Sequence, residues 1–246
     1  MDILQAIEER HSVRQYADKA IEQEKRQALC DELKKINTEG GLNIQILFDE
    51  PKCFDSMMAH YGKFSGVKNY IALVGKKGKS LEEKCGYYGE RLALVAQTLG
   101  LNTCWVAMSH GKSAAKIERG EKQVCLIALG YGKTQGVAHK SKAVSEVSKT
   151  DVAMPDWFKK GVEAALLAPT AINQQKFMFE LSGDEVFATV SGFGFYVKTD
   201  LGIAKYHFEV ASGRSVKRAK IDRCVCVVEN YRIKAFSKTI LMISYR

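Results

Sequence analysis

The sequence predicts a layered fold of the α/β or α+β class. Segments with apolar residues at helical spacing alternate with short runs rich in branched apolar residues. Turn formers separate them, such as the glycine pair after the helix expected over residues 20–37. The chain has 246 residues, 46% of them hydrophobic, and is therefore long enough to bury a substantial core.

The first part of the chain contains most of the regular pattern. We expect helices over residues 2–9, 20–37 and 80–99, and strands over 42–48, 69–75, 102–108 and 123–131. The helix over 80–99 presents apolar residues on one face and ends just before Gly100. Taken alone, this helix is best explained as a buried structural element.

A second, shorter part follows a polar stretch that we interpret as a connector. Residues 133–155 are weakly patterned and contain Pro155. Beyond them we expect a helix over 157–166, strands over 177–182 and 185–190, and a helix over 200–210. We therefore divide the chain into a first half (1–140), a connector (141–155), a second half (156–212) and a tail (213–246).

The basic charge is concentrated in the tail, whose fold the sequence does not predict. The formal net charge is +9, and residues 213–246 carry nine Lys/Arg against two acidic residues. The tail therefore contributes +7 of the net charge of +9, and the nearly neutral body does not favour nucleic-acid binding. The runs CVCVV (224–228) and TILMISY (239–245) in this tail are strand-like.

The composition also bears on compartment and metals. No apolar run approaches the ~20 residues of a membrane helix, and the acidic N-terminus does not resemble a secretory signal. Seven irregularly spaced cysteines lack a CxxC pair or zinc-type spacing. We therefore expect a cytoplasmic protein with reduced, structural cysteines and no metal.

The segment RHSVR, residues 10–14, is the first candidate site. In an extended chain alternate side chains share a face, which places Arg10, Ser12 and Arg14 together. Two guanidinium groups and a hydroxyl suit a phosphate or carboxylate. A solvated loop with surface arginines is the alternative, and this pattern alone favours it.

Other patterns fail as catalytic motifs. LVGKKGKS, residues 73–80, follows a strand and precedes a helix, but only two residues separate its glycines where a phosphate-binding P-loop needs four. No GxGxxG fingerprint, HExxH pair or local Ser/His/Asp arrangement occurs. We interpret the lysine-rich turn as a surface feature and the five scattered histidines as satisfied or solvent-facing.

The segment LAPTAINQQKF, residues 167–177, interrupts the regular pattern between a helix and a strand. Pro169 should stop the preceding helix near Ala168. The hydroxyl of Thr170 and the amides of Asn173 and Gln175 could complement the polar edge of a planar heterocycle. A capped turn that satisfies its own backbone is the alternative, and the segment alone favours it.

Together these segments resemble the nitroreductase family of FMN-dependent oxidoreductases. ERHSVRQY (9–16) resembles the family's flavin-phosphate segment, and GERLALVAQTLGLNTCWV (89–106) its central helix and strand. LIALGYGKTQGVAHKSK (126–142) resembles a strand followed by a basic pair, and LAPTAINQQKF the segment A-P-[ST]-x-x-N-x-Q-P-[WF]. The resemblance covers most of residues 1–211, and Lys176 departs from it by replacing the usual proline.

This resemblance implies an α+β fold, a three-layer α/β/α sandwich with a central, mostly antiparallel sheet. It also implies an enzyme that passes reducing equivalents from NAD(P)H through FMN to an electron-poor small molecule such as a nitro compound or quinone. A flavin-binding or sensory module without turnover is the first alternative, and nucleic-acid binding through the tail is the second.

The order of the segments differs from that in ordinary members, where the two flavin-binding segments lie close together in the sequence. Here LAPTAINQQKF follows the connector, and the second half has no RxSxR segment. The resemblance therefore implies a fused pseudo-dimer, with two related halves, one flavin site and no need for a second subunit. The second half looks truncated, and the abrupt basic tail suggests a changed reading frame or an unrelated extension.

The resemblance implies cofactor contacts and no catalytic side chain. Backbone around Val106 to Ser109 is expected near the reactive edge of the flavin ring. The expected cofactor-binding residues are Arg10, His11, Ser12, Arg14, Val106, Ala107, Lys140 and Lys142 from the first part, and Pro169, Thr170, Ala171, Asn173 and Gln175 from the second.

Overall fold

Two four-stranded sheets form the framework of residues 1–218, the part of the chain that this computed structural model describes. The first sheet has the order β1-β2-β4-β3 and is antiparallel throughout. The second has the order β5-β6-β7-β8, in which β6 and β7 are antiparallel and the outer strands run parallel to their neighbours. The mixed α+β class and the antiparallel sheet are confirmed, but a single central sheet is not formed.

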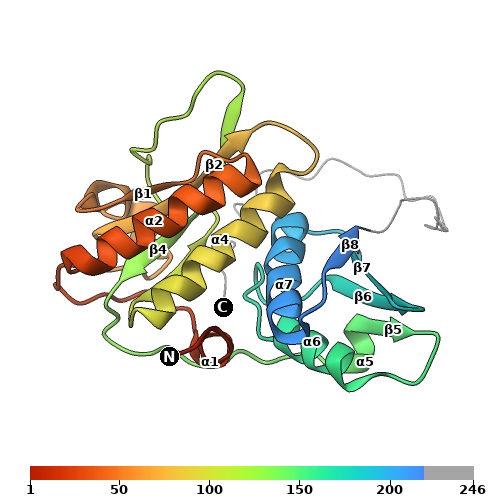
Figure 1. Cartoon of the computed structure of the whole chain (residues 1–246). Helices are drawn as coiled ribbons and strands as arrows, with labels where there is room; N and C mark the ends of the chain where they lie inside the picture. The colour runs from red at the N-terminus through yellow and green to blue at the C-terminus, as the bar shows by residue number, and fades with distance from the viewer. Residues whose placement is uncertain (219–246) are drawn as a thin grey trace, which may run out of the picture.

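The helices divide between the sheets and meet in the middle of the molecule (Figure 1). α2 (Gln23–Gly40) and α4 (Leu81–Thr98) pack with the first sheet, and α6 (Asp156–Leu166) and α7 (Val197–Ser212) with the second. α4 and α7 lie side by side, and α1 (Ile3–Glu9) contacts both. Two sheets form because these central helices separate the strands of one half from those of the other.

The first sheet is covered on both faces, so its two central strands bury apolar side chains on both faces. Its strands are β1 (Gln45–Leu47), β2 (Asn69–Lys76), β3 (Asn102–Val106) and β4 (Glu121–Gly130). Along β2, Ile71 and Leu73 pack in the cluster beneath α2 and α4, whereas Tyr70 and Ala72 pack with Phe64. The opposite face is covered by the segment containing η1 (Pro51–Cys53) and α3 (Met57–Tyr61).

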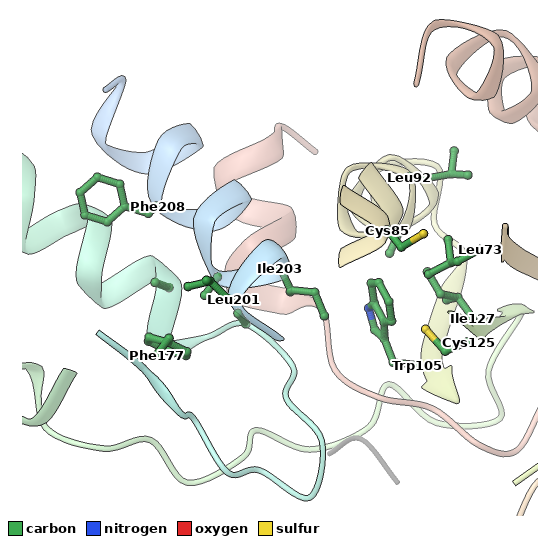
Figure 2. Close-up of a cluster of buried hydrophobic side chains, with 14 of the residues drawn as sticks. Leu73, Cys85, Leu92, Trp105, Cys125, Ile127, Phe177, Leu201, Ile203 and Phe208 are labelled. Atoms are coloured by element: carbon green, nitrogen blue, oxygen red, sulfur yellow. The ribbon is translucent and has the colours of Figure 1, made fainter. Parts of the chain in front are cut away.

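The core is continuous between the halves. Trp105 and Ile127 of the first sheet belong to the same buried cluster as Phe177 and Phe208 of the second half (Figure 2). Ile203 of α7 lies between these two groups in the same view. The side chains positioned by one half are therefore held rigidly against those of the other.

The region expected as a connector contributes to the second sheet. It contains α5 (Val144–Val147) and β5 (Ser148–Thr150), and β5 pairs in parallel with β6 (Phe177–Ser182). The start of the tail also folds, because β8 (Val216–Arg218) pairs with β7 (Glu185–Val190). The strand-like runs expected at 224–228 and 239–245, and with them Cys224 and Cys226, lie outside the described residues.

Each helix and strand expected within residues 1–212 occurs, with ends shifted by a few positions. The glycine pair ends α2 as expected, since Gly41 adopts the left-handed conformation at φ 60°. The short elements η1, α3, α5, β5 and β8 were not expected. Within the described part of the chain, no helix combines the length and apolar character needed to cross a bilayer.

Candidate functional site

Three segments far apart in the sequence line one cavity of about 280 Å³. Ser12 and Arg14 come from the segment after α1, and Asn173 from the loop after α6. The stretch after β4 supplies the remaining wall, with Val137, Ala138, His139 and Lys140. The structure thus brings together four of the residues proposed from sequence: Ser12, Arg14, Lys140 and Asn173.

The first segment is extended because it is hydrogen-bonded to β3 and to the loop before β2. Val13 N donates to Thr103 O at 3.1 Å, and Tyr16 N donates to Ser65 O at 2.9 Å. Val13 and Tyr16 are buried in the core. The guanidinium of Arg14 lies over the Phe64 ring, 5.9 Å from its centroid. An extended segment was the expected conformation, and it leaves Ser12 and Arg14 at the cavity.

Arg10 and His11 do not line this cavity. Arg10 is the C-terminal cap of α1, only 2% exposed, and its Nε lies 3.4 Å from Glu90 Oε1 inside the protein. His11 lines a neighbouring cavity with Gly136. Alternation alone predicted that Arg10 would share a face with Ser12 and Arg14, but the end of α1 and the buried carboxylate of Glu90 direct it inward.

The second segment is a strained, self-bonded turn. Ile172, Asn173 and Gln175 have φ values of 49°, 57° and 44°, a region that non-glycine residues rarely occupy. Asn173 N donates to Thr170 O at 3.0 Å, and Gln175 N donates to Thr170 Oγ1 at 3.1 Å. The capped-turn alternative therefore describes the backbone, and strain of this kind is typical of functional loops.

The side-chain amides of this turn clamp the stretch that carries the basic pair. Asn173 Nδ2 and Gln175 Nε2 both donate to Lys140 O, at 2.8 and 2.9 Å. Gln175 Oε1 accepts from Lys142 N at 2.9 Å, and Lys142 Nζ donates to Gln175 O at 3.0 Å. These bonds of Asn173 and Gln175 to Lys140 and Lys142 are called the clamp. Gln175 is 2% exposed and takes part only in the clamp, as does Lys142, whereas Asn173 also faces the cavity.

The other five proposed residues are buried. Val106 and Ala107 lie at the end of β3, and Ala107 O is 3.5 Å from the Tyr196 hydroxyl. Thr170 and Ala171 are buried, as is Pro169. None of these five residues lines the cavity.

Sequence reasoning missed two residues that shape the site. Asp200, in the first turn of α7, is buried and its carboxylate accepts from Ala171 N at 3.1 Å and from Gln174 Nε2 at 2.7 Å. His139 faces the cavity with Nε2 2.9 Å from Leu166 O, and burial lowers its pKa despite this hydrogen bond. No sequence motif marked Asp200, whereas the neighbouring basic pair could have drawn attention to His139.

The polar groups at the site are suited to an anionic, hydrogen-bonding ligand. Arg14 and Lys140 are cationic and line the cavity. Arg10 Nε and Nη1 and Ser12 Oγ are buried atoms with no hydrogen-bond partner among the described residues, although Ser12 lies near the Cys104 thiol. Burial raises the pKa of that thiol, so Cys104 contributes no negative charge. A hydroxyl without a hydrogen-bond acceptor, beside two cations at the cavity, fits a phosphate group.

Fold and site together define an α+β protein of two tightly packed parts with a cationic, amide-bearing cavity supplied by both. The family model described as "Putative TM nitroreductase" matches residues 2–212, and the chain belongs to this nitroreductase family. Membership supports an oxidoreductase role. No curated protein sequence matches the chain significantly.

Solved structures show where this fold recurs. A crystal structure described as "a putative nitroreductase" from Thermotoga maritima is 23% identical, covers 86% of this chain and 83% of its own, and has a TM-score of 0.62. Another, from Desulfovibrio desulfuricans in complex with FMN, is 17% identical over 63% of this chain and 98% of its own, with a TM-score of 0.49. An FMN-dependent nitroreductase from Clostridium difficile is 18% identical over 55% of this chain and 90% of its own, with a TM-score of 0.44. The Thermotoga structure shares the fold.

Proposed function

We propose that this protein is an FMN-dependent oxidoreductase that passes reducing equivalents from NAD(P)H to an electron-poor small molecule. One observation carries the proposal: Ser12, Arg14, Lys140 and Asn173 line a single cavity, although they come from distant segments of the chain. Membership of the nitroreductase family supports the reaction class, and the FMN complex of the Desulfovibrio protein supports the cofactor.

Each group at the cavity has a role suited to its chemistry. Arg14 and Lys140 hold the phosphate by charge-assisted hydrogen bonds, whereas Arg10 is paired with Glu90 inside the protein. Ser12 Oγ and the Asn173 amide bind neutral polar atoms, since each can both donate and accept. His139 stays neutral and adds no charge to the cavity. FMN supplies the hydride chemistry when bound, and the chain supplies orientation and electrostatics.

The proposal includes two related halves in one chain. With the short elements η1 and α3 left aside, α2, β1, β2, α4 and β3 follow one another in the first half, and α6, β6, β7, α7 and β8 have the same order of helix, strand, strand, helix, strand. α2 contacts α4, and α6 contacts α7.

Contacts at corresponding positions of the two central helices support this pairing. Lys84 Nζ of α4 donates at 2.8 Å to the carbonyl oxygen of Gly40, the last residue of α2, whereas Asp200 of α7 accepts from Ala171 N after α6 at 3.1 Å. A lysine that binds a carbonyl in one half thus corresponds to an aspartate that binds an N–H group in the other.

The two halves differ in the loop that would complete a second site. The turn after α6 carries Thr170, Asn173 and Gln175, whereas the chain between α2 and β1 spans only Gly41 to Ile44, and its one amide, Asn43, is bonded to Glu121. We therefore propose one FMN per chain and a functional monomer, in place of the paired sites of a homodimer.

The test uses the full chain, purified and reconstituted with FMN. We expect a yellow protein that releases one FMN per chain on denaturation and elutes as a monomer. Steady oxidation of NADH or NADPH should then require a quinone or nitroaromatic acceptor. Bound flavin without turnover would establish the non-catalytic alternative, and absence of FMN binding would exclude both.

A further inference from the structure

A buried cluster of charged side chains connects the halves behind the cavity. Glu90 of α4 is at its centre: Oε2 accepts from Trp105 Nε1 at 2.7 Å, and Oε1 lies 3.0 Å from His207 Nε2. The same Oε1 lies 3.4 Å from Arg10 Nε. Glu90 and His207 have no exposed surface, and Arg10 is 2% exposed. One carboxylate thus holds side chains from β3, from α7 and from the segment after α1.

The partners of His207 fix its protonation state. Nδ1 lies 3.0 Å from Ala164 O of α6, and a carbonyl can only accept, so Nδ1 carries a proton. Burial opposes ionisation of Glu90, yet Arg10, His207 and Trp105 together hold its pKa below the usual value. Nε2 therefore faces a carboxylate and must also donate. Acceptors at both ring nitrogens are the geometry that suits a doubly protonated ring beside Glu90.

We propose that His207 is a positioning residue for the cofactor site, since as an imidazolium it fixes Glu90, and Glu90 fixes Arg10 at the base of the segment that carries Ser12 and Arg14. The inference rests on the proposed FMN site. Ser12 is two residues beyond Arg10 and forms an isolated bridge with Thr103 of β3. Trp105 of the same strand donates to Glu90. The segment is therefore held by Arg10 at one end and by β3 alongside it, and both contact the carboxylate of Glu90.

The charged and titratable groups around His207 come from several elements. Glu90 faces it from α4, and Arg10 stands on the far side of that carboxylate. α6 presents only the Ala164 carbonyl to the ring. His139 is close enough that the charges of Arg10 and His207 add to the effect of burial in lowering its pKa. Loss of the His207 proton would remove one cation and leave Nε2 without a hydrogen for Glu90.

The protonation state can be read directly from long-range ¹H–¹⁵N correlations of the histidine rings. The full chain is compared with His207→Gln to assign the signal. Two protonated ring nitrogens at neutral pH are expected for His207. A neutral-ring pattern would overturn the proposal, and because this measurement needs no FMN, it stands apart from the proposed function.

FMN affinity tests the positioning role. His207→Gln keeps one donor for Glu90 but no charge, and should weaken FMN binding about tenfold. Wild type and His207→Gln should also differ in how FMN affinity depends on pH, because only the wild type has an ionisable side chain at this position. The matched control is His60→Gln, which should behave as wild type. His60 is an exposed histidine of α3 that lies beside Asp55. Identical affinities or identical pH profiles for wild type and His207→Gln would overturn the role.

If His207→Gln fails to fold, measurements on the wild-type protein still test the positioning role of His207. Ring protonation and FMN affinity are measured on the same samples across pH, with the ring signal assigned from the residues around it. The two curves should share a midpoint. Separate midpoints would show that His207 does not position the site, and a chain that binds no FMN at any pH would refute the proposed function instead.

Discussion

Gly86 of α4 and Gly202 of α7 make reciprocal contacts where the two central helices cross. A Cβ placed on Gly86 would lie 2.0 Å from Thr199 O of α7, and one placed on Gly202 would lie 2.0 Å from Glu83 O of α4. Glu83 and Thr199 each precede the glycine of their own helix by three positions. Exchange of this kind, in which each helix presents the same position to the other, is typical of two-fold interfaces.

Gly86→Ala should therefore destabilise the protein, although alanine is the better helix former. The added methyl must push α7 away, and overpacking of this kind costs about 1–3 kcal/mol. Urea unfolding monitored by circular dichroism measures the change. Gly78→Ala is the control, since its Cβ would meet only Lys76 O, at 4.0 Å. A more stable Gly86→Ala variant would contradict the close crossing.

The sequence predicted the helices and strands well because their apolar periodicity reflects burial. α4 and β2 carry long, regular apolar patterns, and both occur within two residues of their expected ends. β5 and β8 are only three residues long, and their parallel pairing depends on strands elsewhere in the chain. Such short edge strands carry too little local pattern to be recognised.

Arg14→Ala tests the first segment of the site. Loss of a charged hydrogen-bond partner should weaken FMN binding by ~1.5–3 kcal/mol, roughly ten- to a hundredfold. Fluorescence titration of the apoprotein with FMN gives the dissociation constant. Arg26→Ala removes a guanidinium that pairs with Asp49 on the surface and should leave the constant unchanged. Equal affinities for Arg14→Ala and wild type would remove Arg14 from the site.

Prediction of the site was less complete, because motifs name residues but do not give the direction of their side chains. Alternation correctly separated Val13 from Ser12 and Arg14, but the helix end at Arg10 broke the pattern. The turn motif identified Asn173, but it could not show that the Gln175 amide forms hydrogen bonds to the backbone of Lys140 and Lys142. Contacts such as Asp200 with Ala171 depend on packing between distant elements and leave no local signal.

Gln175→Leu separates the clamp from ligand binding. The replacement has similar bulk but leaves the Lys142 N–H without its acceptor, so we expect a loss of ~1–3 kcal/mol in the free energy of unfolding. Gln27→Leu, on the exposed face of α2, should change stability by no more than about 0.5 kcal/mol. Wild-type stability for Gln175→Leu would show that the clamp contributes nothing.

His139 should make stability depend on pH below neutrality. Burial lowers its pKa from the ordinary value of 6.5, so the unfolded chain takes up a proton before the folded one does. Stability should thus fall as pH drops below 6.5 and through the folded pKa. His139→Gln should flatten the profile of unfolding free energy between about pH 5 and 7, and His60→Gln should not. Parallel profiles for wild type and His139→Gln would show that the ring is not held neutral.

Asn173 can be tested for strain and for ligand contact separately. Glycine adopts φ 57° without strain, so Asn173→Gly removes the amide and relieves the backbone strain. Asn173→Ala removes the amide but keeps the strain. Both variants lose the bond to Lys140 O and should bind FMN about two- to tenfold more weakly, consistent with one neutral hydrogen bond. In urea unfolding Asn173→Ala should lose more stability than Asn173→Gly, because only alanine keeps a Cβ at this positive φ. Wild-type affinity in Asn173→Gly would mean that the amide shapes the turn without contacting the flavin.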